Sequence, residues 1–159
     1  MIPKALPAPR IVDPNSVPKL RWGVIGPGAI AETFVDATHK YTQQRITAVA
    51  SRTPGKGDAF ARQRGIETVY TDYEHLVGDP NIDVIYVATT HEFHLDHALL
   101  AIQAGKHVLV EKPIAITAEQ AQRIAEAYRS AELQNYCHES RCEERDCSQL
   151  FGWQRQIYF

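Results

Sequence analysis

The chain has 159 residues, of which 44% are hydrophobic and 23% are charged, and its formal net charge is −2. This length suffices for about one domain with a substantial buried core. The near-neutral balance gives no general attraction to nucleic acid or to anionic membranes, and no apolar run approaches the roughly 20 residues that a transmembrane helix needs. The composition therefore predicts a soluble globular protein with no nucleic-acid partner and no membrane partner.

The N-terminal region, residues 1–19, is rich in proline. Five of the nine prolines lie within the first 20 residues, and the segment has no apolar stretch of the kind found in secretory signals. Proline-rich sequence favours an extended backbone. We therefore predict an extended arm over residues 1–19, followed by a folded domain over residues 20–133.

A glycine-rich segment follows the first strand-like run of this domain. Residues 26–31, Gly-Pro-Gly-Ala-Ile-Ala, match the dinucleotide-binding fingerprint G-x-G-x-x-G/A, with alanine in the last place. Gly26 permits a sharp turn out of the strand, and Gly28 lets a pyrophosphate approach the backbone. The pyrophosphate then meets the start of the next helix, at Ala29 and Ile30, where free N–H groups favour an anion. These four residues are predicted to bind the cofactor.

Strand-like and helix-like segments alternate between residues 20 and 133. The predicted strands are residues 20–25, 46–50, 68–70, 84–88 and 107–110, and the predicted helices are residues 29–41, 55–64, 72–76, 92–104 and 118–133. This alternation predicts an α/β fold in which a parallel sheet is covered on both faces. We expect a doubly wound Rossmann sheet with the strand order 3-2-1-4-5 and right-handed crossovers.

Residues at the predicted helix ends support this division. Gly65 and Gly105 follow the second and fourth helices and suit the left-handed backbone found just beyond a helix. Asp72 can cap the short third helix, and Thr117 with Gln120 forms a capping box ahead of the fifth. Each predicted helix from the second onward therefore has a recognisable start or stop signal.

The end of the second strand is where a dinucleotide-binding domain meets the adenosine ribose. An acidic residue there binds the 2′-hydroxyl and selects NAD. This chain has no acidic residue between positions 46 and 53 and instead has Ser51 and Arg52, a hydroxyl and a guanidinium that suit a phosphate. We predict that both residues bind the cofactor and that NADP is preferred over NAD. The alternative is a solvated Arg52 in a turn, with either cofactor accepted.

Glu111, Lys112 and Pro113 follow the fifth strand, at the carboxyl edge where open α/β sheets bind ligands. Lys112 can donate a hydrogen bond to a substrate oxygen or to the nicotinamide ribose, and Glu111 can orient the lysine. Pro113 restricts the preceding residue to an extended backbone. In isolation such a tripeptide is more often a surface turn, but its place after the fifth strand favours a functional role.

Three segments of the chain have the order and spacing that is typical of one family of proteins. They are residues 23–31, residues 88–90 with His94, and residues 105–113. They closely resemble the N-terminal domain of the Gfo/Idh/MocA oxidoreductases over about residues 20 to 131. The resemblance implies an NAD(P)-dependent enzyme that oxidises a sugar, a polyol or a related hydroxyl by hydride transfer. It implies a catalytic role for Lys112 beside the nicotinamide and the substrate. The further cofactor-binding residues that it implies are Ala88, Thr89, His94 and Glu111.

The chain departs from the family pattern in two places. The family often has Thr-Pro-Asn where this chain has Thr89, Thr90 and His91, so contacts of that proline and asparagine are not carried over. Family members also continue into a C-terminal α/β substrate domain, which supplies the usual catalytic histidine. The histidine that follows Lys112 here is His138, which comes too soon for that role. We therefore expect a cofactor domain that lacks the substrate domain and does not turn over substrate alone.

The sequence changes character after residue 133. A sixth strand is due, but residues 134–159 contain no apolar run and hold the three cysteines, Cys137, Cys142 and Cys147. We expect a poorly ordered tail, of the kind that a frameshift or early termination produces. An odd number of cysteines without a signal peptide indicates free thiols and a cytoplasmic location.

Two other functions stay open beside a truncated oxidoreductase. A non-enzymatic nucleotide-binding module would use the same site without turnover. A different doubly wound domain, such as a nucleoside-binding transferase, is disfavoured by the placement of residues 111–113. In the resembled family, assembly usually runs through the second domain, so both a homo-oligomer and a monomer stay open for this chain.

Neither of two metal-like patterns predicts a metal site. His91, His94 and His97 spread over about 120 degrees of a helix, so at most two of them could share an ion. The cysteines have the spacing C-x4-C-x4-C, whereas structural zinc sites pair their ligands around a turn. We therefore predict no metal cofactor.

Overall fold

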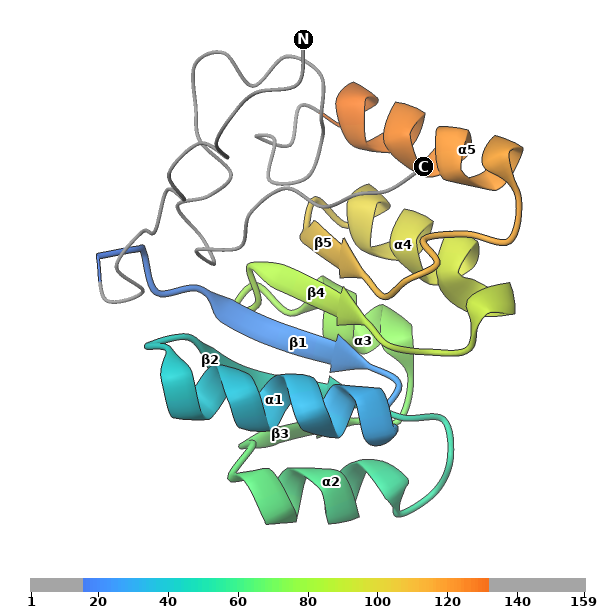
Figure 1. The fold of residues 1–159 in the computed structure, drawn as a ribbon. Coiled ribbons are helices and arrows are strands. Elements are labelled where there is room, and N and C mark those ends of the chain that lie inside the picture. Colours follow the sequence, from blue (N-terminus) through green and yellow to red (C-terminus); the bar gives the residue numbers. More distant parts are fainter. Residues whose placement is uncertain (1–15, 132–159) are drawn as a thin grey trace, which may run out of the picture.

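The computed structural model describes residues 16–131 of the chain, and the five strands among them form one parallel sheet (Figure 1). The strands are β1 (Arg21–Ile25), β2 (Arg45–Ala50), β3 (Thr68–Tyr70), β4 (Val84–Val87) and β5 (His107–Val110). Their order in the sheet is β3-β2-β1-β4-β5. The predicted doubly wound Rossmann fold and its strand order are therefore confirmed. The predicted tail, residues 134–159, and most of the predicted arm lie outside the described residues.

Four α-helices and one short 3-10 helix connect the described strands, and a fifth α-helix follows β5. They are α1 (Ala29–Tyr41), α2 (Lys56–Arg64), α3 (Tyr73–Gly78), η1 (His91–Phe93), α4 (His94–Gln103) and α5 (Ala118–Ser130). The prediction placed α1 correctly at both ends. It ended α3 too early at residue 76, because the helix runs on to Gly78. It placed the end of the last helix at residue 133, whereas α5 ends at Ser130.

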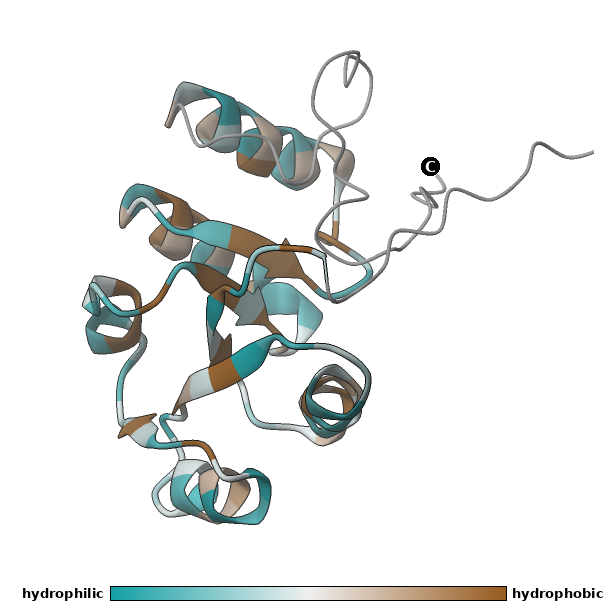
Figure 2. Ribbon diagram, turned by 90° about the vertical axis from the view of Figure 1, so that its left-hand side faces the viewer, coloured by the Kyte–Doolittle hydropathy of each residue, from teal (hydrophilic) through white to brown (hydrophobic). Residues whose placement is uncertain are grey.

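The helices cover the sheet on both faces because successive side chains of a strand point to opposite sides. Trp22 and Val24 of β1 belong to a core formed with α1 and α2, whereas Ile25 belongs to a core formed with α3 and α4. Figure 2 shows hydrophobic residues along the strands and on the helix sides turned toward them. α5 packs against α4 through Ile124 and Tyr128, beyond the β5 edge of the sheet.

The predicted start and stop signals act largely as expected. Gly65 and Gly105 adopt left-handed φ angles of 65° and 72°. The Asp72 carboxylate caps α3 by accepting the backbone N–H of His75 at 2.8 Å. At α5, the Thr117 hydroxyl accepts from the backbone N–H of Gln120, but the Gln120 side chain accepts from Ile116 instead of Thr117.

One buried glutamine, Gln44, forms hydrogen bonds that hold the segment before β1 against the sheet. The Gln44 side chain is 0% exposed and lies at the beginning of β2. Its Oε1 accepts from the backbone N–H of Leu20 and from the Trp22 indole, and its Nε2 donates to the carbonyl of Pro18 at 2.8 Å. Val17 is also buried.

No helix among residues 16–131 is both long and apolar enough to cross a membrane.

Candidate functional site

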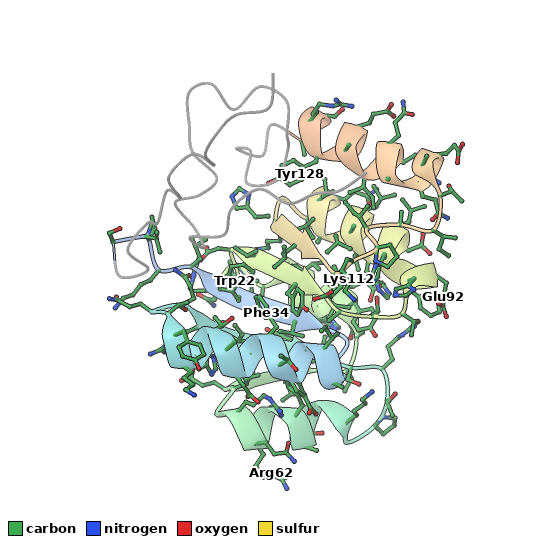
Figure 3. The ribbon with its side chains drawn as sticks, viewed as in Figure 1. Trp22, Phe34, Arg62, Glu92, Lys112 and Tyr128 are labelled. Carbon is green, nitrogen blue, oxygen red and sulfur yellow. The ribbon has the colours of Figure 1, made fainter. Side chains whose placement is uncertain are left out.

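The sequence-predicted site residues lie in the loops that leave the carboxyl ends of four strands, or in the first turn of a helix that follows such a loop. Gly26 follows β1, Ser51 follows β2, Ala88 follows β4 and Glu111 follows β5. Because parallel strands end at one edge, these loops meet there. Figure 3 shows Lys112 beyond the carboxyl ends of β4 and β5. The fold thus brings the predicted residues to a single edge of the sheet.

The turn from β1 into α1 requires glycine at position 26. Its φ is +89°, and a Cβ there would lie 2.7 Å from the Thr89 side chain and 3.0 Å from the Ala88 carbonyl oxygen. The backbone N–H of Gly26 donates to the Ala50 carbonyl at 3.3 Å. The turn is therefore packed directly against the end of β4, and any side chain would push the two loops apart.

The start of α1 is open in front of Gly28. A Cβ at this position would meet nothing within 4 Å, and no side chain caps the helix. The first backbone N–H groups of a helix have no partner within it. Ala29 and Ile30, which begin the helix, are both exposed. A phosphate group can therefore approach these N–H groups without meeting a side chain at Gly28.

Ser51 shapes the loop that follows β2. The Ser51 side chain is 7% exposed, and its Oγ accepts the backbone N–H of Thr53 at 3.2 Å. The backbone N–H of Ser51 donates to the Tyr70 carbonyl at the end of β3. Its hydroxyl therefore closes a local turn and fixes the backbone from which Arg52 projects.

Arg52 lies over two aromatic rings at the same edge. The central guanidinium carbon is 5.2 Å from the centroid of the Tyr73 ring and 5.5 Å from that of Phe93. Among the described residues, none forms a hydrogen bond or ion pair with its guanidinium. A pocket of about 120 Å³ lies beside Arg52, between the loop after β2, the start of α2 and the end of β3, and Asp58 also borders it. Arg52 is thus an exposed residue whose guanidinium contacts two aromatic rings.

Glu111 acts on the backbone beside Lys112. Its Oε1 accepts the Tyr86 hydroxyl at 2.5 Å, and its Oε2 accepts the backbone N–H of Lys112 at 3.1 Å. Burial and the neighbouring carboxylate raise the pKa of Tyr86 far above its ordinary value, so the hydroxyl stays protonated and donates. Glu111 therefore contacts the backbone of Lys112, and no hydrogen bond joins it to the Lys112 ammonium. Its predicted role in orienting the Lys112 side chain stays a prediction.

The Lys112 side chain itself is exposed at the carboxyl edge. The peptide bond between Lys112 and Pro113 is cis. Among the described residues, none forms a hydrogen bond or ion pair with the Lys112 ammonium. The ammonium is therefore available to donate to a ligand oxygen at this edge.

His94 joins the loops after β4 and β5. Its ring is 0% exposed, with Nδ1 at 2.8 Å from the Pro113 carbonyl oxygen and Nε2 at 3.0 Å from the Thr89 carbonyl oxygen. A neutral imidazole donates from one nitrogen, and an imidazolium donates from both. Because both partners are acceptors, a neutral ring can donate to only one of them, and a bond to both needs a proton on each nitrogen. The ring lies between the Lys112–Pro113 segment and the end of β4. A contact of His94 with the cofactor stays a prediction.

Three aromatic rings near the site were not predicted from the sequence: Tyr73, Phe93 and His97. The three rings contact one another or Arg52, and the His97 ring also lies 3.0 Å from the Thr89 hydroxyl through Nδ1. They come from α3, η1 and α4, so no local spacing in the sequence indicates that they meet. Phe93, directly before His94, is the one sequence feature that could have indicated a contact here, and its ring lies under the Arg52 guanidinium.

The described part of the chain contains no metal-like cluster of three or more His, Cys, Asp or Glu side chains. His91 and His94 contact each other edge to face, but both nitrogens of His94 lie against carbonyl oxygens. The cysteine pattern of Cys137, Cys142 and Cys147 lies outside the described residues.

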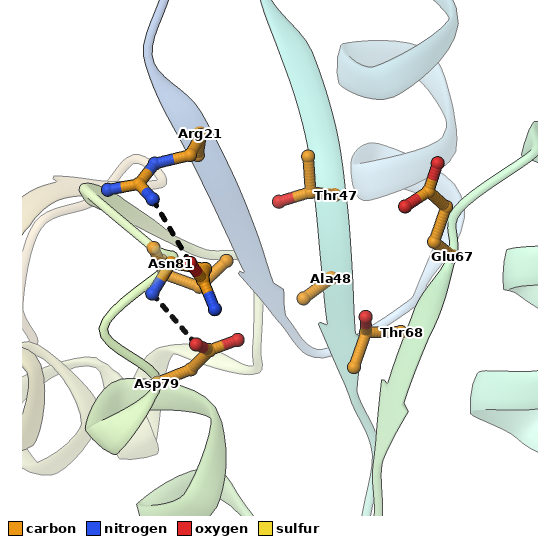
Figure 4. A pocket seen from close by; sticks show the side chains of 8 residues that line it. Arg21, Thr47, Ala48, Glu67, Thr68, Asp79 and Asn81 are labelled. Carbon is orange, nitrogen blue, oxygen red and sulfur yellow. Dashed lines mark hydrogen bonds between the residues drawn. The ribbon is translucent and has the colours of Figure 1, made fainter.

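A second pocket, of about 250 Å³, lies at the amino edge of the sheet (Figure 4). Three of its polar residues are joined by hydrogen bonds: the Arg21 side chain donates to the Asn81 side chain, and the backbone N–H of Asn81 donates to the Asp79 carboxylate at 2.8 Å. Open α/β sheets bind ligands at the carboxyl edge. The amino-edge pocket is therefore not the candidate site.

The glycine turn, the open start of α1 and the parallel sheet together define a dinucleotide-binding Rossmann domain. Residues 20–138 match the oxidoreductase family with an NAD-binding Rossmann fold, Gfo/Idh/MocA. Because this match covers most of the chain, the chain belongs to that family. The resemblance carried by residues 23–31, residues 88–90 with His94, and residues 105–113 is thus confirmed.

Two curated relatives show what the chain is similar to. It is 43% identical over 111 residues to 1,5-anhydro-D-fructose reductase of Ensifer adhaerens, which covers 70% of this chain and 33% of the relative. It is 37% identical over 132 residues to D-xylose 1-dehydrogenase (NADP(+)) of Hypocrea jecorina, which covers 72% of this chain and 32% of the relative. The chain therefore spans about a third of the length of these relatives.

Two solved structures share the fold and are at least 25% identical in sequence to this chain. A 3-ketoreductase from Actinomadura kijaniata in complex with TDP-benzene and NADP has a TM-score of 0.67 and 32% identity, over 72% of this chain and 36% of that chain. A scyllo-inositol dehydrogenase from Lactobacillus casei with NAD(H) and scyllo-inositol has a TM-score of 0.65 and 25% identity, over 72% and 34%. Since one neighbour holds NADP and the other NAD, the cofactor preference depends on side chains rather than on the fold.

Proposed function

We propose that this domain binds NADP(H) in preference to NAD(H), as the cofactor domain of an oxidoreductase acting on a CH–OH group of a sugar or polyol. The observation that carries the proposal is Arg52 at the end of β2, over the Tyr73 and Phe93 rings and without a charged partner among the described residues. A guanidinium there favours a 2′-phosphate, and no acidic residue at positions 46–53 opposes it. The relatives and neighbours that act on sugars or polyols support the substrate class.

The residues present fit the cofactor along the carboxyl edge. The open space in front of Gly28 and the unpaired N–H groups of the first turn of α1 suit the pyrophosphate. Arg52 and the pocket beside it suit the 2′-phosphate. Lys112 lies in the loop after β5 at the same edge. These positions match the order in which a dinucleotide crosses a Rossmann sheet.

In this proposal the bound nicotinamide supplies or accepts the hydride, and the chain positions the reacting groups. Lys112 donates a hydrogen bond to the oxygen of the substrate. The Tyr86–Glu111 pair fixes the Lys112 backbone, and His94 lies between the same segment and the end of β4. An alcohol must also lose its hydroxyl proton to a base. Because the relatives are about three times as long as the matched region, we expect the 159-residue chain to bind cofactor without turnover.

Titration of the full 159-residue chain with NADPH and with NADH tests the cofactor preference. We expect NADPH to bind more tightly, and we expect Arg52→Ala to weaken NADPH binding by about 10- to 100-fold while changing NADH binding little. Arg62→Ala is the matched control, because Arg62 is an exposed arginine of α2 that lies away from Lys112 (Figure 3). Equal affinities that Arg52→Ala leaves unchanged would contradict the preference.

A turnover assay on the same protein distinguishes a cofactor domain without turnover from a complete enzyme. We expect no NADPH formation above background when sugars and polyols are added to the chain with NADP. Turnover that Lys112→Ala abolishes would show a complete enzyme. Binding of neither cofactor would contradict both a cofactor domain of an oxidoreductase and a non-enzymatic nucleotide-binding module.

A further inference from the structure

Three rings converge around Arg52 from separate elements of the fold. Tyr73 begins α3, Phe93 ends η1 and His97 lies in the second turn of α4. We refer to Tyr73, Phe93 and His97 as the ring cluster. We propose that the ring cluster positions Arg52 and thereby sets how strongly the domain distinguishes a 2′-phosphate from a 2′-hydroxyl. This inference rests on the proposed binding of NADP(H).

The rings form one connected set. The His97 ring meets the Tyr73 ring edge to face, with 4.7 Å between centroids, and stacks on the Phe93 ring at 5.7 Å. The Arg52 guanidinium carbon lies over Tyr73 and Phe93 at 5.2 and 5.5 Å. Each ring thus contacts another ring, and two of them also contact the guanidinium.

The ring cluster is anchored on its inner side and open on its outer side. Tyr73 is 8% exposed and His97 is 6% exposed, whereas Phe93 is 38% exposed. The His97 Nδ1 lies 3.0 Å from the Thr89 hydroxyl, directly behind the Gly26 turn. Thr89 is therefore shared between the turn proposed to hold the pyrophosphate and the rings that hold Arg52. The two phosphate-binding positions are linked through packed side chains.

Contact with ring faces leaves a guanidinium able to bind an anion. The attraction between a ring face and the cation uses no hydrogen-bond acceptor, so the guanidinium keeps N–H groups for an anion. An arginine that is already held in place loses less conformational freedom when it binds a phosphate. The structure meets both conditions, because Arg52 contacts two rings and no described residue accepts from its N–H groups. The aromatic contacts prepare the guanidinium for a bidentate contact.

The ratio of the dissociation constants for NADH and NADPH measures this positioning in the full chain. We expect Phe93→Leu to lower the ratio about two- to fivefold, as loss of one exposed cation–π contact predicts. The ratio falls because NADPH binding weakens while NADH binding stays near its wild-type value. Phe93→Tyr keeps the ring and should keep the ratio. Phe93 is suited to the test because its partial exposure makes the leucine variant tolerable to the fold.

Tyr41→Leu is the matched control. Tyr41 is 67% exposed and also has a cation over its ring, the Lys40 ammonium at 4.9 Å from the centroid. It ends α1, away from the carboxyl edge. The variant therefore removes a similar exposed cation–π contact elsewhere, and it should leave the ratio unchanged.

The resonance of the Arg52 side-chain Nε–H group gives a second measurement that needs no ligand. Ring faces shift nearby protons, so the resonance should move toward its random-coil position in Phe93→Leu and stay in place in Phe93→Tyr. A ratio that Phe93→Leu leaves unchanged or raises, while Arg52→Ala removes the NADPH preference, would overturn the ring-cluster proposal alone. A ratio that Arg52→Ala also leaves unchanged would overturn the cofactor preference together with it.

Discussion

At the amino edge of the sheet, two basic side chains have hydrogen-bond partners, whereas two basic side chains at the carboxyl edge have none among the described residues. Arg21 pairs with Asp83 at 2.6 Å, and the Lys106 ammonium donates to the carbonyls of Asp79 and Ile82 at 2.7 and 2.8 Å. At the other edge, Arg52 and Lys112 have no such partners among the described residues. Paired groups contribute stability, and unpaired groups are available to a ligand.

The backbone also differs between the two edges of the sheet. At the amino edge the loop before β4 is held by Arg21, whose side chain donates to Asp83, Asn81 and the Pro80 carbonyl. At the carboxyl edge the start of α1 has an open approach at Gly28 and no side-chain cap. At the amino edge the loop before β4 is thus held by side-chain hydrogen bonds, whereas at the carboxyl edge the start of α1 is open to an anion.

Gly26→Ala should have the largest effect, because it removes both stability and binding at the carboxyl edge. The new Cβ would lie 2.7 Å from the Thr89 side chain at a φ of +89°. We expect the free energy of unfolding to fall by about 2–4 kcal/mol and NADPH binding to be lost.

Gly65→Ala is the control for Gly26→Ala. It has the same kind of left-handed φ, +65°, but its Cβ would meet nothing within 4 Å. We expect a loss of about 1–2 kcal/mol with NADPH binding retained, as measured by urea unfolding and titration. Equal losses in the two variants would show that the contact with Thr89 is unimportant.

Lys106→Met tests the amino edge by itself. It removes two charge-assisted hydrogen bonds to backbone carbonyls and keeps much of the apolar stem. We expect the free energy of unfolding to fall by about 1–3 kcal/mol while the NADPH affinity stays at its wild-type value. A large loss of NADPH affinity in a variant that is still folded would mean that the two edges are coupled.

The prediction from sequence succeeded where signals are local. The elements were identified from strand-like and helix-like segments that alternate, from the glycines at positions 65 and 105 and from the Asp72 cap. This alternation, with the glycine fingerprint at the first turn, predicted the order of the strands. The loops after β2 and β5 could also be placed, because carboxyl ends of parallel strands meet at one edge.

Tertiary contacts explain what the sequence did not predict. The His94 ring lies between two carbonyl oxygens, and Glu111 pairs with Tyr86 on the neighbouring strand β4. The contact of Arg52 with Phe93 joins residues 41 positions apart. No periodicity within one helix or strand encodes such contacts, because they depend on how the loops pack after the sheet has formed.

Acidification should have a smaller effect, centred on His97 at the carboxyl edge. Burial, and then the positive charge of Arg52, hold the pKa of His97 below its ordinary value, although Asp96 and Glu74 oppose this shift. The unfolded chain therefore binds a proton more readily than the folded chain, and stability falls as pH drops through the unfolded pKa of about 6.5.

Urea unfolding between about pH 7.5 and pH 5.5 measures this effect. We expect a shallower loss of stability on acidification in His97→Gln than in the wild type. Part of the dependence should persist, because burial also lowers the pKa of His39 and His107. The exposed His91→Gln serves as the control. An unchanged slope in His97→Gln would show that His97 does not contribute to the acid sensitivity.

The most direct test of the difference between the two edges is a titration of the ¹⁵N-labelled chain with NADP, followed through backbone amide resonances. We predict that resonances of Gly26, Gly28, Arg52 and Lys112 move with a common dissociation constant. Those of Arg21, Asp79 and Lys106 at the amino edge should stay in place. Shifts confined to the amino edge, or no saturable shift at the carboxyl edge, would contradict the account.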